Sequence, residues 1–202
     1  LSSIPGGGIE VSSRRVHDTL FPNKLNAQQW KEVSRCVAQA GLTQYATMLY
    51  GHIETIQERV DHLLFLRDLQ DEYQHIVTFT PLAFHPEGTS LSDMPHTSGI
   101  DDLKMVAVSR LMLDNISHIK TFWVMNTPEV SQAALWYGAD DMDGTVLRYE
   151  ITHSDERPQD NEQGLSYHKM VRLIRQAHRN PVERDSFYKP LPLDEEMNND
   201  ST

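Results

Sequence analysis

The chain has 202 residues, of which 39% are hydrophobic and 23% are charged, and its formal net charge is −11. This length and composition predict one sizeable globular domain. The acidic balance argues against a nucleic-acid surface, which needs clustered Lys and Arg. No apolar run approaches the roughly 20 residues of a membrane helix, and no signal-peptide pattern opens the sequence. We therefore expect a cytoplasmic protein that binds neither nucleic acid nor membranes.

Patterns typical of helices and strands alternate along the chain. A helix is predicted over 26–40, with Asn26 as its N-cap and Gly41 just past its end. A capping box from Thr55 to Glu58 begins a second helix, which runs to about residue 72. The other predicted elements are strands over 43–50, 76–80, 119–125 and 145–151, helices over 100–115, 128–137 and 166–179, and loops over 81–96 and 154–164.

Strands that begin near residues 43, 76, 119 and 145, each followed by a helix, predict repeated βα units and a parallel sheet. In such α/β folds, functional residues lie on the loops after the carboxyl ends of the strands. Four or five units could form an open doubly wound sheet, and they are too few to close a barrel of eight. A chain that starts in mid-element favours the second half of a barrel, but the residues alone leave this choice open.

The single cysteine, Cys36, excludes an intramolecular disulfide and any metal or iron–sulfur site built from several cysteines of this chain. It lies in an apolar helical stripe with Trp30, Val37 and Ala40, so we expect a small buried hydrophobe. The low cysteine content is typical of a reducing compartment.

Several polar residues are candidates for chemistry. His52, His85 and His153 each follow a predicted strand and could face a pocket, where a histidine can donate to a carboxylate or move a proton. Each of them, taken alone, fits a solvated loop equally well. Glu58 and His62 share a helix face at a spacing that can hold a metal, but exposed polar pairs are far commoner at that spacing than ligands.

Each of three further stretches can be interpreted as a functional site or as an ordinary structural element. The glycine run 6–8 could approach a phosphate but is more often a turn. The stiff loop from Phe79 to Thr89 could form an apolar slot that reads a flat ring, or it could be a crossover. The acidic stretch 140–145 has the first part of a calcium-loop pattern without the glutamate that completes it, so a turn into the next strand is favoured.

Long stretches in a fixed order carry a family resemblance. They are GGGIEV, ATMLYGHIET-x-x-ERVDHL, F-x-PLAFHPEGT-x-L, GIDDLK-x-x-AVSRLMLDN, HIK-x-FWVM, ADDMDGTV and PVERDSFY. Over residues 5 to about 189 they resemble the C-terminal half of the radical S-adenosylmethionine (SAM) enzymes of the futalosine route to menaquinone. The resemblance implies the later strands of a (β/α)8-type barrel over 1–189, while the acidic composition of 190–202 predicts a disordered tail.

The resemblance also implies site residues. Thr47 to Glu54 is similar to that superfamily's strand-five motif GxIxGxxE, with Thr for the first Gly and Leu for Ile. Leu49 would then line the adenine pocket, and the backbone of the loop from Phe79 would read the adenine ring. The residues implied for SAM are Glu10, Leu49, Gly51, Glu54, Phe79 and Pro81. Those implied for the substrate are His52, His85, His153 and, as a weaker choice, Arg110. No catalytic or metal residue is assigned.

The implied activity needs a 4Fe–4S cluster, SAM, a small-molecule substrate and an external electron donor. The family holds its cluster in a CxxxCxxC loop that is absent from these 202 residues. We therefore expect the cluster loop and early strands to precede Leu1 in a longer chain, and the chain alone to be inactive.

The implied reaction adds a 5′-deoxyadenosyl radical to 3-[(1-carboxyvinyl)oxy]benzoate, giving 6-amino-6-deoxyfutalosine and carbon dioxide. One alternative is the cyclisation of dehypoxanthine futalosine in the same pathway. A second alternative is a nucleotide-binding module without a cluster.

Overall fold

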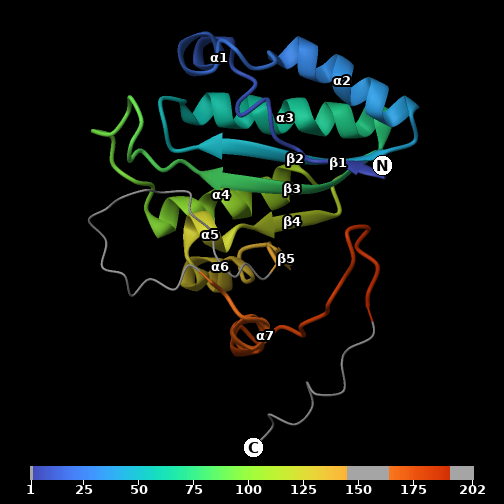
Figure 1. Cartoon of the computed structure of the whole chain (residues 1–202), viewed down its shortest axis with the longest axis vertical. Coiled ribbons are helices and arrows are strands. Elements are labelled where there is room, and N and C mark those ends of the chain that lie inside the picture. The colour runs from blue at the N-terminus through green and yellow to red at the C-terminus, as the bar shows by residue number, and fades with distance from the viewer. Residues whose placement is uncertain (1, 145–163, 192–202) are drawn as a thin grey trace, which may run out of the picture.

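Five parallel strands form one sheet in a computed structural model that describes residues 2–144 and 164–191 (Figure 1). The strands are β1 (Ser3–Ile4), β2 (Thr43–Tyr50), β3 (Ile76–Ala83), β4 (His118–Thr121) and β5 (Asp141–Met142). Their spatial order is their order in the chain, and every pairing is parallel. Consecutive βα units of a (β/α)8-type barrel have this arrangement, so the predicted α/β fold class is confirmed.

The helices are α1 (Arg14–Leu20), α2 (Ala27–Gln39), α3 (Ile56–Tyr73), α4 (Gly99–Met112), α5 (Trp123–Asn126), α6 (Pro128–Ala134) and α7 (Tyr167–Gln176). Asn26 caps α2 and a capping box at Thr55 begins α3, as the sequence predicts. Asn26 also forms a capping box, and a third at Ser98 begins α4. No described helix is both long enough and apolar enough to cross a membrane. In Figure 1, α2 and α3 cover the same side of β2.

The sheet has a covered face and an open face. Along β2, alternate residues from Gln44 to Tyr50 are buried, and the residues between them are half-exposed. The buried set packs with α3 and α4 in the main core, whose members include Ala46, Met48, Tyr50, Leu63, Leu66, Leu69, Phe79, Met105, Val106 and Ile119. Strand register places Leu49 beside Leu82 on the opposite, open face. In a closed barrel this open face would be the interior.

Two strand boundaries differ from those predicted. β3 continues to Ala83, beyond the predicted end at residue 80, because it stays paired with β2 over its whole length. The predicted strand over 119–125 is wrong in its second half, since β4 ends at Thr121 and Trp123 begins α5. A short apolar run does not distinguish a strand from a helical turn by periodicity.

The acidic stretch 140–145 was predicted to be a turn, but Asp141 and Met142 form β5 beside β4. Its carboxylates all have protein cations as partners. Asp140 pairs with Arg110, and Asp143 pairs with Lys120. These pairings explain why an acidic segment can lie in a sheet. The strand predicted over 145–151 and the loop predicted over 154–164, except for its last residue, lie outside the described residues.

The prediction for Cys36 is wrong, because this residue is exposed. The buried side of α2 passes through Trp30, Ser34 and Val37 instead. Ser34 lies on that side because its hydroxyl donates to Gln44, at 2.7 Å, beneath the sheet. The apolar pattern did not predict that the polar Ser34 would be buried. With Ser34 on the buried side of α2, Cys36 lies on the exposed side.

The segment after α7 returns to the amino-terminal ends of the strands (Figure 1). The Tyr188 ring stacks on His118 with centroids 3.7 Å apart and planes 6° apart. The Tyr45 hydroxyl donates to the Ser186 carbonyl at 2.7 Å. The segment therefore covers the open face at the amino-terminal ends of the strands. Within the segment, Arg184 and Pro190 form an antiparallel β-bridge. Of the predicted tail 190–202, residues 192–202 lie outside the described residues.

Candidate functional site at the carboxyl ends of β2 and β3

Leu49 and the turn that follows β2 form the centre of the candidate site. The Leu49 side chain is half-exposed on the open face, beside Leu82. Its amide donates to the Glu10 carbonyl at 3.0 Å, so Glu10 lies next to it on the β1 side. The Glu10 carboxylate forms an ion pair with Lys24. Leu49 and Leu82 thus form an apolar surface, and Glu10 borders it on the β1 side with a carboxylate that is only 11% exposed.

Phe79 and Pro81 point their side chains away from this surface. Both belong to the buried residues of β3, and the Phe79 side chain is fully buried in the core. In the register, Phe79 pairs with Ala46 and Pro81 with Met48, which are residues of the covered face. At Phe79 and Pro81, therefore, only the main chain can face a ligand on the open side, whereas the Leu82 side chain lies on it beside Leu49.

Gly51 allows the chain to turn sharply after β2. Its φ is +92°, a conformation that L-residues rarely adopt. A Cβ atom at this position would lie 2.3 Å from Cγ2 of Thr97, in the loop before α4. Both the backbone conformation and the close approach of Thr97 therefore require glycine.

The Glu54 carboxylate closes this turn. It accepts hydrogen bonds from the amides of Gly51, at 2.6 Å, and His52, at 2.8 Å. Arg59 donates to it from Nε at 2.8 Å. Burial would raise the pKa of Glu54, but the hydrogen bonds from His52 and Gly51 and the charge of Arg59 outweigh it and lower the pKa to about 2. Glu54 is thus a buried anion that holds the turn in shape.

His52 does not face an open pocket in the described part of the chain. Its side chain has no exposed area, and it lies between the ring edges of Phe21 and Phe84, with centroids 5.9 Å from each. Its Nε2 donates to the Leu49 carbonyl at 3.1 Å, and its Nδ1 lies 2.9 Å from the Ile53 amide and 2.8 Å from a Glu54 carboxylate oxygen. The expectation that His52 faces substrate is therefore replaced by a role in positioning the turn.

The other residues expected to contact substrate lie apart from one another. His85, directly after Phe84, bonds through Nε2 to the Met125 carbonyl at 2.9 Å and lies at the carboxyl edge. Arg110 lies at the opposite, amino-terminal edge, where it donates to the Gly138 carbonyl and pairs with Asp140. This arrangement removes Arg110 from the candidate site. His153 lies outside the described residues.

Tyr50 and Asp102 were missed by sequence reasoning. Both are buried, and the Tyr50 hydroxyl donates to Asp102 at 2.7 Å. Burial and the charge of Asp102 raise the pKa of Tyr50, and Arg59 lies over its ring at 5.3 Å. This bond ties the end of β2 to the first turn of α4. The acidic start of α4 was a visible signal, but the sequence does not tell which strand it meets.

Glu58 and His62 do not form a metal site. Glu58 caps α3 and pairs with Arg15. His62 is fully buried, accepts from the Ser12 amide at 3.0 Å through Nδ1 and contacts the Thr47 carbonyl at 3.1 Å through Nε2. Burial lowers its pKa to about 4, against the raising effect of the bond to Thr47. Its ring nitrogens are thus engaged with the main chain.

Acidification is expected to destabilise the fold through His62. Its folded pKa lies below the ordinary 6.5, so the unfolded chain alone takes up this proton between pH 6.5 and about 4. The free energy of unfolding should fall as pH drops through this window, by on the order of 3 kcal/mol. The melting temperature of His62→Gln should fall less steeply than that of the wild type as the pH is lowered from 6.5 to about 4. His168→Gln, an exposed control on α7, should follow the wild type; equal slopes for His62→Gln and wild type would contradict the prediction.

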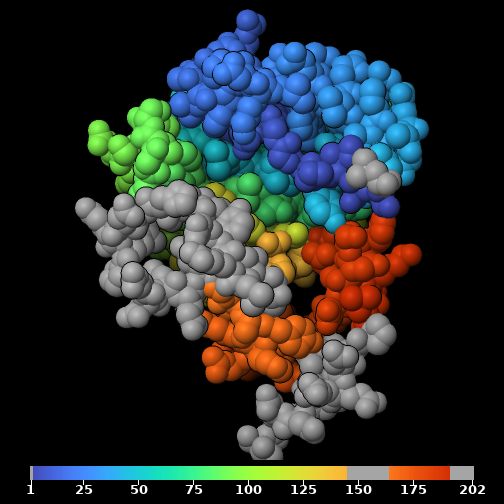
Figure 2. All heavy atoms as spheres, viewed as in Figure 1, coloured from blue at the N-terminus to red at the C-terminus, as the bar shows by residue number. Residues whose placement is uncertain are grey.

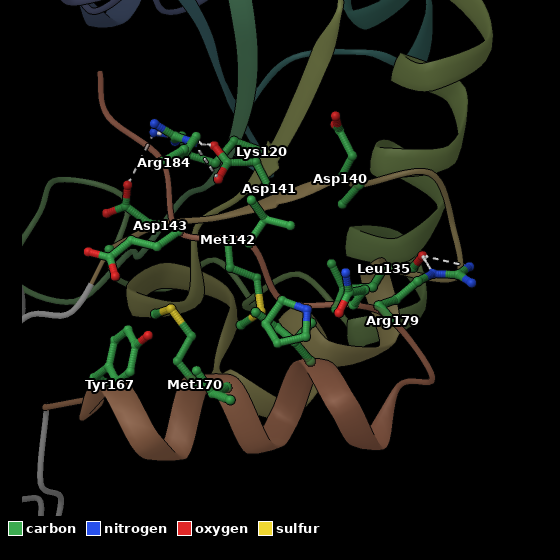
Figure 3. Close-up of a pocket in the computed structure, with 18 of the residues that line it drawn as sticks. Lys120, Leu135, Asp140, Asp141, Met142, Asp143, Tyr167, Met170, Arg179 and Arg184 are labelled. Carbon is green, nitrogen blue, oxygen red and sulfur yellow. Dashed lines mark hydrogen bonds and ion pairs between the residues drawn. The ribbon is translucent and has the colours of Figure 1, made fainter. Parts of the chain in front are cut away.

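A hollow of about 690 Å³ lies away from this site, between β5, α7 and the segment after α7 (Figures 2 and 3). Most of the charged groups on its wall have partners within the described residues. Arg184 pairs with Asp141, Lys120 lies 3.3 Å from Asp143, and Arg179 donates to the Leu135 carbonyl (Figure 3). Because these charges are already paired, this hollow is a weaker candidate than the carboxyl edge of β2 and β3.

A comparison with protein families places the chain. Residues 73–197 match the family model described as the CofH/MqnC C-terminal region. The chain belongs to this family. It is 44% identical over 95% of its length to aminodeoxyfutalosine synthase of Thermus thermophilus and 39% identical to that of Streptomyces coelicolor. It is 36% identical over 94% of its length to 5-amino-6-(D-ribitylamino)uracil–L-tyrosine 4-hydroxyphenyl transferase 1 of Methanosarcina barkeri. The chain spans about half the length, 52%, of each of these relatives.

Proposed function

We propose that this member of the CofH/MqnC family is the C-terminal part of a radical SAM aminodeoxyfutalosine synthase. The observation that carries the proposal is the identity to two synthases, 44% and 39%, against 36% to a relative with a different name. The predicted motifs support the same choice, since LYGHIET, FHPEGT and PVERDSFY resemble the synthase better than the cyclase of the same pathway.

In the proposed reaction, SAM and a 4Fe–4S cluster supply a 5′-deoxyadenosyl radical that adds to the vinyl group of 3-[(1-carboxyvinyl)oxy]benzoate. Rearrangement and loss of carbon dioxide, with return of the one electron spent on releasing methionine from SAM, would then give 6-amino-6-deoxyfutalosine. The described residues do not fit the cluster, because three thiolates are needed and Cys36 is exposed on α2. In the proposed enzyme, the cluster ligands would come from the N-terminal half of the barrel.

The carboxyl edge of β2 and β3 fits the adenosyl side of such a site. Leu49 and Leu82 give an apolar wall, and the main chain of β3 beside them can hydrogen-bond to an adenine edge. Glu10, whose main chain bonds to Leu49, is proposed to accept a hydrogen bond from a ribose hydroxyl. Gly51 and Glu54 fix the turn that holds Leu49 in place, and this chain contributes positioning and exclusion of water.

The proposal can be tested with a hybrid enzyme that joins the N-terminal half of the Thermus thermophilus synthase to this chain. After anaerobic reconstitution with iron and sulfide, it is given either 3-[(1-carboxyvinyl)oxy]benzoate or dehypoxanthine futalosine, with SAM and dithionite. Mass spectrometry should detect 6-amino-6-deoxyfutalosine from the first substrate and no product from the second. Cyclised product from the second substrate would instead support the cyclase. An intact cluster without turnover of either would favour the nucleotide-binding module.

A further inference from the structure

Two histidines and a glutamate come together in the loop between β3 and α4. His85 and Glu87 follow β3, and His96 lies near the end of the same loop. One ligand atom from each residue lies within 4.8 Å of the other two. The rings of His85 and His96 meet at 90° with centroids 5.5 Å apart. The loop thus gathers two imidazoles and a carboxylate at one point.

The hydrogen bonding of His85 fixes its tautomer. Its Nε2 lies 2.9 Å from the Met125 carbonyl, which can only accept, so Nε2 carries the proton. Nδ1 then carries the lone pair, and this atom is buried and meets no donor within the described part of the chain. A bare buried acceptor is costly. A metal-binding histidine shows this same arrangement, in which the other ring nitrogen donates to a backbone carbonyl.

Glu87 supplies the anion of the group. Burial would raise its pKa, but its own amide and His96 outweigh this and lower the pKa, so the carboxylate is ionised at neutral pH. The His96 Nε2 lies 2.5 Å from a Glu87 oxygen. An ordinary His–Glu ion pair would explain this contact alone. It would not explain why the Nδ1 lone pair of His85 is buried beside the pair.

We propose that His85, Glu87 and His96 bind one zinc ion. Two imidazoles and one carboxylate form a donor set of zinc sites that keep a fourth position open for water or a ligand oxygen. Nitrogen donors disfavour Mg²⁺ and Ca²⁺, which select oxygen. The His96 side chain is 46% exposed, so the ion has a path from solvent. Thr97, next to His96, touches Gly51, so a bound ion would also fasten this loop against the turn after β2.

The test uses the 202-residue chain, stripped with a chelator and titrated with zinc chloride. Elemental analysis after desalting should find about one zinc per chain, and His85→Ala and His96→Ala should each weaken binding at least about tenfold. His168→Ala removes an exposed histidine on α7 and should bind as the wild type does. The Co²⁺ form should show the intense visible bands of a four-coordinate site, and His96→Ala should lose them.

Circular dichroism checks that the variants are folded, and His96→Ala is the safer variant because its side chain is partly exposed. No zinc retained by folded wild-type chain would overturn the proposal. Equal retention by wild type, His85→Ala and His96→Ala would overturn it as well, because the zinc would then lie elsewhere. The readout is metal content, so it is independent of the outcome for the proposed radical reaction.

Discussion

Replacing Glu54 by Ala is expected to lower the free energy of unfolding by about 3 to 5 kcal/mol, because it leaves the Arg59 charge without its partner and two turn amides without an acceptor. The Glu54 side chain has no exposed area, whereas Arg59 is 24% exposed and can recover some hydration, which favours the lower value. For a chain of this size the melting temperature should fall by roughly 10 °C at pH 7. Glu54→Gln, which keeps one acceptor oxygen, should lie between the wild type and Glu54→Ala.

The matched control for this experiment is Glu32→Gln. Glu32 pairs with Arg35 on the surface of α2 and is 56% exposed, so its loss should change the melting temperature little. The pH adds a second check. The folded pKa of Glu54 is about 2, below its ordinary 4.5, so its stabilising effect is lost as pH falls from 4.5. The difference in melting temperature between the wild type and Glu54→Gln should therefore narrow below pH 4.5. Equal melting temperatures at pH 7 would contradict the role given to Glu54.

Replacing Asp141 by Ala is expected to release the segment after α7 from the sheet. The Asp141 side chain is 9% exposed, accepts from Arg184 and also accepts from the Tyr188 hydroxyl at 2.6 Å. Without it, both groups lose their acceptor, and the local opening free energy should fall by about 2 kcal/mol. That corresponds to tryptic cleavage after Arg184 that is more than tenfold faster under native conditions.

Asp143→Ala is the control for the release experiment. Asp143 lies two residues away and is 27% exposed, and Lys120 is its ion-pair partner. Its loss should leave the cleavage rate after Arg184 within about twofold of the wild type. Tyr188→Phe removes one of the two bonds to Asp141 and should give an intermediate rate. If Asp141→Ala and Asp143→Ala were cleaved equally fast, the anchoring role of Asp141 would be wrong.

The sequence predicted those parts of the fold that depend on neighbouring residues alone. Asn26 and Thr55 set helix starts through their own side chains, and the alternation of β2 shows its two faces. β5 could not be predicted in this way, because Asp141 is stabilised in a strand by Arg184 and Tyr188, which are 43 and 47 residues away in the sequence. Cys36 was misplaced for a similar reason, since the buried position of Ser34 depends on Gln44 in another element.

The location of the candidate site stays a prediction, and the structure changes the roles expected for some of its residues. The rule that parallel strands carry function at their carboxyl ends pointed to the stretch 47–55, and the family resemblance implied Leu49, Gly51 and Glu54 within it. It could not show that His52 turns inward, because that orientation depends on Phe21 and Phe84. It also gave no reason to join His85 with His96, since only the folded loop brings their rings together.

The measurement that tests the central claim most directly is an anaerobic crystal structure of the hybrid enzyme with its cluster and SAM. We predict that the adenine lies against Leu49 and the main chain of β3, with Glu10 near the ribose. Adenine held in the hollow between β5 and α7, or against residues of the N-terminal half alone, would contradict the placement of the site at the carboxyl ends of β2 and β3.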